Sequence, residues 1–111
     1  MAPTGDLSPT SRSAVAWDGR HPGKPDIVLE AGNFQRQPGG VFAVPYFPNF
    51  VLTTSKGGSS GSELTWTGET SAATARAAGL LGRTMWSYPH LMPETVRGLL
   101  VHSAEWTAAM R

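Results

Sequence analysis

Apolar residues are grouped in short segments that are separated by runs rich in proline, glycine and serine. Before residue 25 the chain is mostly polar, with one apolar patch at 14–17 that could form a short strand. The Ile-Val-Leu run at 27–29 is followed by a turn sequence ending at Gly32, which predicts a buried strand. Three prolines and several aromatic residues between 35 and 49 favour an irregular surface loop.

The middle of the chain has the pattern of a β-hairpin. Residues 50–54 and 64–67 are both strand-like, and the Gly/Ser-rich stretch between them is a flexible connection. The composition then changes at Ser71 to an alanine-rich run without proline that Pro89 ends. This run predicts a helix over 71–88, roughly 27 Å long.

The predicted helix over 71–88 has few polar positions, so we expect most of its circumference to be buried, with Arg76 and Arg83 on its one solvent-facing side. A second helix is predicted over 93–103, because Pro93 suits the first turn and Glu94 complements the helix dipole there. Helical spacing gives it one core-facing stripe, made of Val96, Leu99, Leu100 and Ser103.

The composition of the chain excludes several classes of protein. It has 111 residues, a net charge of +1 and only 15% charged residues, against roughly 25% in ordinary globular proteins. This thin polar covering is typical of a piece of a larger domain. The absence of a basic stripe argues against nucleic-acid binding, and the apolar runs are too short for a membrane span.

Cofactor chemistry finds no support in the sequence, and none is expected. The chain has no cysteine, and no pair of histidines or acidic residues has metal-ligand spacing. His90 and His102 are expected at the surface or as a helix cap, and Asn33 and Asn49 as turn formers. The first residues lack the basic head and apolar stretch of a secretory signal, and the compartment stays unpredicted.

Ser71 is the candidate for chemistry, because it lies where a strand and turn lead into the first turn of a long helix. Unpaired N–H groups and the helix dipole favour negative charge there, so the N–H of Ser71 could help to hold an oxyanion. The structural alternative is that Ser71 is only the helix N-cap, a position at which serine is among the preferred residues.

The wider pattern resembles the subtilisin-like serine proteases. In that family Gly-Thr-Ser-x-Ala opens the central helix, Ala-Gly follows in the same helix, and a Lys-Pro-Asp strand with a following Gly precedes it. Four blocks occur here in the family's order: Ser8–Arg12, Lys24–Val28 with Gly32, Thr70–Ala73 with Ala78–Gly79, and Pro93–Leu100. The resemblance covers nearly the whole chain, and the serine block is its most specific part.

This resemblance implies an α/β fold, namely the C-terminal portion of a subtilisin-like doubly wound parallel sheet. It implies a serine-type endopeptidase that cuts peptide or protein substrates through an acyl-enzyme on Ser71. In the family the acid and base precede the serine, in segments like Asp-Ser/Thr-Gly and His-Gly-Thr, and neither occurs here. Residues 1–111 are therefore expected to be an incomplete catalytic domain, nearly inert alone, whose partner is its own upstream half.

A triad within the chain is a weaker alternative. Asp6 or Asp18, then His21 and Ser71, would satisfy the family's chain order, but the sequence around Asp18 and His21 matches neither family motif. The Asn that donates to the family's oxyanion hole also belongs before residue 1 by spacing.

The chain departs from the family at positions close to the serine. Glu69 stands where the family has Gly directly before Thr-Ser, and its carboxylate should disfavour a nearby oxyanion unless it points to solvent. Ala75 and Arg76 replace the Pro and His that usually follow. These departures motivate a second hypothesis, a degenerate remnant that acts as a binding or inhibitory module. A third is an unrelated small α/β module.

Overall fold

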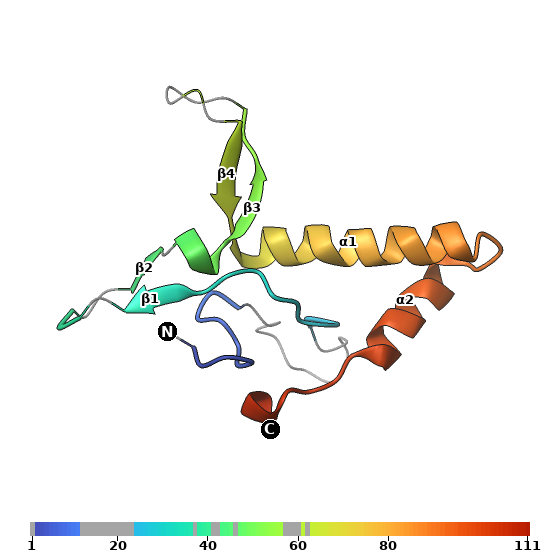
Figure 1. Cartoon of the computed structure of the whole chain (residues 1–111). Coiled ribbons are helices and arrows are strands. Elements are labelled where there is room, and N and C mark those ends of the chain that lie inside the picture. Colours follow the sequence, from blue (N-terminus) through green and yellow to red (C-terminus); the bar gives the residue numbers. More distant parts are fainter. Residues whose placement is uncertain are drawn as a thin grey trace.

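A computed structural model of the chain describes residues 2–11, 24–36, 38–40, 43–45, 47–56, 61 and 63–111. These residues form two helices and two small antiparallel sheets, a mixed α/β structure (Figure 1). The long helix α1 (Glu69–Ser87) lies across the molecule, and α2 (Pro93–Ser103) lies against its C-terminal part. The strand considered at 14–17 lies outside the described residues.

The predicted β-hairpin is confirmed. Strand β3 (Val51–Thr54) pairs antiparallel with β4 (Leu64–Thr67), with Val51 opposite Thr67 and Thr54 opposite Leu64. The hairpin projects from the N-terminal end of α1 (Figure 1). Strand β4 leads through Gly68 directly into α1, so the hairpin fixes where the helix begins.

A second antiparallel pair occurs where we expected an irregular loop. Strand β1 (Phe34–Arg36) pairs with β2 (Ala43–Pro45), and a 3₁₀ turn, η1 (Phe47–Asn49), follows. The prolines do not prevent this pairing, because Pro45 is the last residue of a three-residue strand on a two-stranded sheet. At such an edge a missing N–H interrupts no central ladder.

The strand predicted at 27–29 is wrong for the described structure. Residues 27–30 carry no strand pairing, and their side chains alternate between half-buried and exposed. A strand needs a neighbour that satisfies its backbone hydrogen bonds. The described residues provide only the two antiparallel pairs, so this apolar run has no sheet to join.

Helix α1 is confirmed as an element, but the predicted burial of most of its circumference is wrong. It begins two residues earlier than predicted and ends one residue earlier, where the N–H of Tyr88 bonds the Thr84 carbonyl at 2.9 Å. Only Ala72 is buried along it, at 4% exposed. The alanine-rich surface stays open because α2 covers only one side of it and no sheet of the described residues packs along it.

Helix α2 has the predicted bounds. Its Val96 is 2% exposed and packs against α1. The predicted stripe does face α1, where it lines an apolar hollow of about 290 Å³ together with Leu80, Leu81 and Thr84. The hollow is only partly filled, since Leu99 remains 52% exposed.

The chain as a whole is more extended than a self-sufficient domain of its size. Its radius of gyration is 17.0 Å, against about 13 Å for a compact chain of this length. Large apolar side chains such as Trp86, Met92 and Trp106 are two-thirds or more exposed. Neither helix combines the length and apolarity that a bilayer crossing requires, among the residues described.

Candidate active site

The N-terminal end of α1 is held by a close backbone approach. The N–H of Glu69 donates to the carbonyl of Ala31 at 2.8 Å. Gly68 lies so near the ring of Phe50 that a Cβ there would be 2.5 Å from Cδ1 and Cε1 and 3.0 Å from the Ala31 oxygen. Glycine is therefore required where β4 meets α1.

Phe50 is itself wedged between two segments. Its ring meets that of Phe34 edge-on, with centroids 5.8 Å apart. On the same side, the N–H of Asn33 donates to the carbonyl of Asn49 at 3.1 Å. Gly32 has φ +97°, and a Cβ there would meet the Asn49 oxygen at 2.8 Å. Gly32, which follows the Lys-Pro-Asp sequence, thus allows the chain at 31–33 to lie close to Asn49 and to the start of α1.

Ser71 lies in the first turn of α1 and is exposed. The helix N-cap is Gly68, so the structure does not support the alternative that Ser71 is the cap. As the third residue of the helix, Ser71 has no carbonyl four residues back within the helix to accept its N–H, and Thr70 shares this property. Both N–H groups are therefore available at the positive end of the helix dipole.

An open pocket of about 400 Å³ adjoins Ser71. The described residues that line it are Pro9, Thr10, Ser11, Glu69, Thr70 and Ser71. The structure thus brings together the Ser-rich block near the N-terminus and the serine block, which are far apart in sequence. A serine hydroxyl, two N–H groups without a carbonyl partner four residues back in the helix and an open space beside them can accommodate an acyl group that reacts at the serine.

A turn shapes the N-terminal wall of the pocket. The N–H of Ser11 donates to the Ser8 carbonyl at 2.9 Å, and the Ser8 and Thr10 hydroxyls lie 3.0 Å apart. Asn33 fixes the start of the same segment, because its side-chain amide donates to the Ala2 carbonyl at 2.8 Å. The amide of Asn33 is thus engaged with the backbone, as expected of a structural asparagine.

Glu69 adopts a backbone conformation that side chains disfavour. Its φ is +65°, in the left-handed region, and it is the only non-glycine residue of the described segments with a positive φ. Such a conformation costs a residue with a side chain about 1 to 2 kcal/mol. The sequence shows that Glu69 replaces a family glycine, but only the structure shows that the position is one that favours glycine.

An ion-pair network ties the Lys-Pro-Asp sequence to α2. The Asp26 carboxylate accepts from Lys24 Nζ at 2.7 Å and from Arg97 Nη2 at 2.9 Å. The Lys24 hydrogen bond, then that of Arg97, lowers the pKa of Asp26 from its ordinary value of 3.8, since both stabilise the charged form. Two of the sequence blocks that carry the family resemblance are thereby joined in space.

Arg76 has a structural partner that the sequence did not reveal. Its Nη1 donates to the backbone carbonyl of Glu30 at 2.8 Å and contacts the Glu30 carboxylate at 3.2 Å. Arg76 is exposed, as expected for a solvent-facing side of α1. Its side chain also ties the helix to the segment that precedes Gly32.

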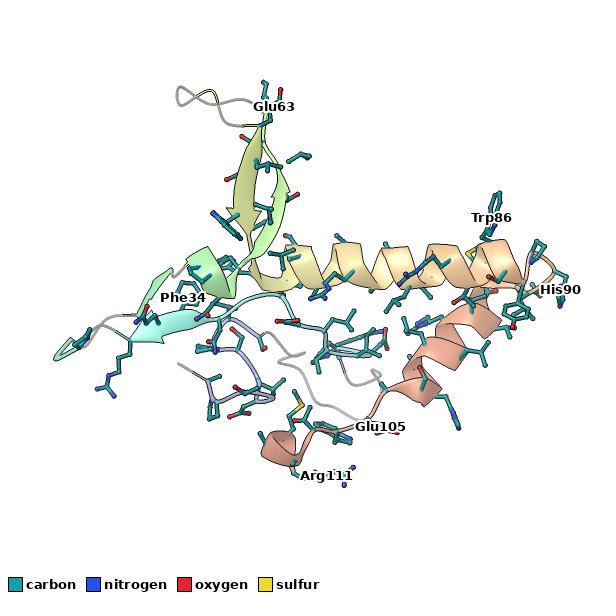
Figure 2. All side chains as sticks on the ribbon, in the orientation of Figure 1. Phe34, Glu63, Trp86, His90, Glu105 and Arg111 are labelled. Carbon is teal, nitrogen blue, oxygen red and sulfur yellow. The ribbon has the colours of Figure 1, made fainter. Side chains whose placement is uncertain are left out.

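Other candidate residues do not join the pocket. The Asp6 carboxylate accepts from the neighbouring N–H of Leu7 at 2.7 Å, whereas Asp18 and His21 lie outside the described residues. His90 lies beyond the C-terminal end of α1 (Figure 2), whereas Ser71 lies in the first turn of this helix, and the His90 ring meets that of Tyr88 edge-on. His102 lies in the last turn of α2.

A metal site finds no support among the residues that the structure describes, since they contain no group of three potential ligands. The model of the subtilase family, a peptidase family, matches residues 2–110, essentially the whole chain. Searches of curated proteins and of solved structures gave no match.

Proposed function

Because this chain belongs to the subtilase family of serine peptidases, we propose that it is the part of a serine endopeptidase that carries the nucleophile, Ser71. The observation that carries this proposal is the position of Ser71. It is exposed in the first turn of α1, and it lines an open pocket rather than capping the helix.

The proposed reaction is peptide-bond hydrolysis in two steps. Ser71 Oγ attacks the scissile carbonyl carbon while a histidine takes its proton, and the histidine then protonates the leaving amine. Water hydrolyses the resulting ester and restores the serine hydroxyl. In this scheme the N–H of Ser71 donates to the oxyanion, helped by the dipole of α1.

The histidine, the aspartate that orients it and the asparagine of the oxyanion hole would come from polypeptide other than residues 1–111. We call this chain together with that polypeptide the assembled protein. The same polypeptide would complete a doubly wound parallel sheet under α1. The exposed alanine-rich surface of α1 and the partly open hollow at α2 support this, because both are apolar surfaces that need covering.

This chain alone should be nearly inert. A serine hydroxyl without a base is a weak nucleophile near neutral pH, and losing the triad's base costs several orders of magnitude in rate. An in-frame coding sequence upstream of Met1 with Asp-Ser/Thr-Gly and His-Gly-Thr would identify the complementary polypeptide. Stop codons there would favour the non-catalytic alternative instead.

The decisive variant is Ser71→Ala in the assembled protein, with Ser87→Ala as the matched control. Ser87 is an exposed serine of the same helix, at the end remote from the pocket. We expect Ser71→Ala to reduce peptide hydrolysis at least about 1,000-fold and Ser87→Ala to leave it unchanged. Normal hydrolysis by Ser71→Ala would overturn the assignment.

One observation favours a second function, a non-catalytic binding module. Glu69 places a carboxylate and a strained backbone directly before Thr70 and Ser71, and Arg76 replaces the family histidine and binds Glu30. Such a module would dock where the C-terminal part of a peptidase domain belongs. In that case, mixing the chain with an active subtilase would inhibit it, and Ser71→Ala would inhibit equally well.

A further inference from the structure

The described residues that line the pocket beside Ser71 make it polar and acidic. Five of these six residues carry side-chain oxygens, and Glu69 is the one charged residue among the six. The other hydroxyl groups on this wall are small and neutral, and that of Thr10 already faces the Ser8 hydroxyl. A ligand that enters this space therefore meets the Glu69 carboxylate next to the serine, the one carboxylate among the described lining residues.

This carboxylate is free to bind a ligand. Within the described part of the chain, the acidic side chains of Asp26 and Glu30 are engaged by Lys24, Arg97 and Arg76, whereas Glu69 has no ion pair. Glu69 is also exposed, so solvent and ligands can reach it. The negative charge of Glu69 is thus not neutralised by an ion pair with another described residue of the chain.

The backbone of Glu69 gives no structural reason for a side chain at this position. At φ +65° glycine would be less strained, and the N–H bond to the Ala31 carbonyl would form with any non-proline residue. Strained residues concentrate at active sites and ligand-binding sites, where the strain is part of the mechanism. The carboxylate itself is the property that glycine could not supply.

We propose that Glu69 determines substrate specificity by selecting peptides with a lysine or arginine adjacent to the scissile bond. This inference rests on the proposed function, because it takes the space beside Ser71 as the place where substrate binds. A basic side chain there would pair with the Glu69 carboxylate, and a bound peptide would displace water and strengthen the pair. An acidic side chain would be repelled.

The kinetic test compares matched peptides that carry lysine, norleucine or glutamate next to the cleaved bond, hydrolysed by the assembled protein. Norleucine has the straight alkyl chain of lysine without the charge. We expect a kcat/KM ratio of lysine to norleucine of about 10 at low salt that falls as salt rises. Glu69→Gln should bring the ratio close to 1.

Glu94→Gln is the matched control. Glu94 is the exposed first-turn glutamate of α2, so the substitution removes the same charge from the same kind of helix position away from the pocket. It should leave the ratio near 10. A ratio near 1 in the unsubstituted protein, or an unchanged ratio in Glu69→Gln, would overturn the inference.

A binding experiment separates this inference from the proposed function. In a Ser71→Ala background the same peptides are not cleaved, so their affinities can be measured by fluorescence anisotropy. We expect about 10-fold tighter binding of the lysine peptide, lost when Glu69→Gln is added. If the assembled protein hydrolysed peptides through Ser71 but did not prefer the lysine peptide, only the inference about Glu69 would be overturned. If it bound the lysine peptide more tightly but hydrolysed no peptide, only the proposed function would be overturned.

Discussion

The two ends of α1 differ in how the chain holds them. At the N-terminal end, Gly68 touches Phe50 and the Glu69 N–H bonds the Ala31 carbonyl. At the C-terminal end, Trp86 is 89% exposed and Tyr88 55% exposed, as the outward Trp86 in Figure 2 illustrates. The contacts that position Ser71 thus come from within residues 1–111. At the other end of α1, the side of the helix that α2 does not cover stays exposed.

This difference indicates which properties the chain carries by itself. The pocket beside Ser71 depends on short-range steric and backbone contacts that this polypeptide supplies. The remaining surface of α1 is apolar and has few neighbours, so its burial requires a further layer. Substitutions should therefore change the free energy of unfolding strongly at the N-terminal end of α1 and weakly at its C-terminal end.

The largest expected effect is that of Gly68→Ala. The new Cβ would lie 2.5 Å from the Phe50 ring, and Phe34 restricts how far that ring can move. We therefore expect Gly68→Ala to lower the free energy of unfolding of the assembled protein by about 2 to 3 kcal/mol, measured by urea denaturation. Gly79→Ala, tested in the isolated chain, is the matched control, since a Cβ there meets no atom of this polypeptide within 4 Å. It should gain about 0.5 to 1 kcal/mol instead. Equal effects of the two substitutions would contradict the close approach.

A smaller effect of opposite sign is expected for Glu69→Gly. Glycine adopts φ +65° without a steric penalty, so the assembled protein should gain about 1 kcal/mol in its free energy of unfolding. Glu69→Ala keeps the Cβ and should not gain stability. If both substitutions changed stability equally, the left-handed backbone at Glu69 would not be the cause.

Asp26→Asn should reduce the free energy of unfolding of the assembled protein by about 0.5 to 1 kcal/mol at pH 7, because the Lys24 and Arg97 pairs are substantially exposed. The folded-state pKa of Asp26 is lowered, so its contribution is present above the unfolded pKa near 3.8 and is lost as pH falls through the lower folded value. The two proteins should therefore converge in urea titrations below about pH 4. A difference that persisted at pH 2 would contradict the ion-pair explanation.

The smallest effect is expected at the opposite end of the helix. Trp86→Ala removes a side chain that is 89% exposed, so the free energy of unfolding of the isolated chain should change by less than about 0.5 kcal/mol. Urea denaturation followed by circular dichroism measures this change. Loss of more than 1 kcal/mol would show that Trp86 packs against this chain, and the contrast between the two ends would fail.

The sequence predicted the elements that depend on local chemistry. Pro93 and Glu94 marked the start of α2, and the alanine-rich run followed by Pro89 marked α1. The strand at 27–29 was wrong because a strand depends on partners, and the described residues offer none. The burial of α1 was wrong for the same reason, since an apolar sequence shows what a surface favours but not whether anything covers it.

The candidate site was predictable in part. The serine motif located Ser71, and the mismatch at Glu69 was visible in the sequence. The strained backbone of Glu69 was not, because it depends on the contacts of Ala31 and Phe50 with the start of α1. The closeness of Thr10 and Ser11 to Ser71 also required the structure, since no local pattern relates residues so far apart.

Covalent labelling can show whether Ser71 is the nucleophile. A peptidyl phosphonate, which reacts with activated serines, is incubated with the assembled protein, and the modified residue is located by mass spectrometry. We expect one phosphonylated residue, Ser71, and no labelling of the isolated chain or of Ser71→Ala. Labelling of a different serine, or unlabelled Ser71 in a protein that hydrolyses peptides, would contradict this assignment.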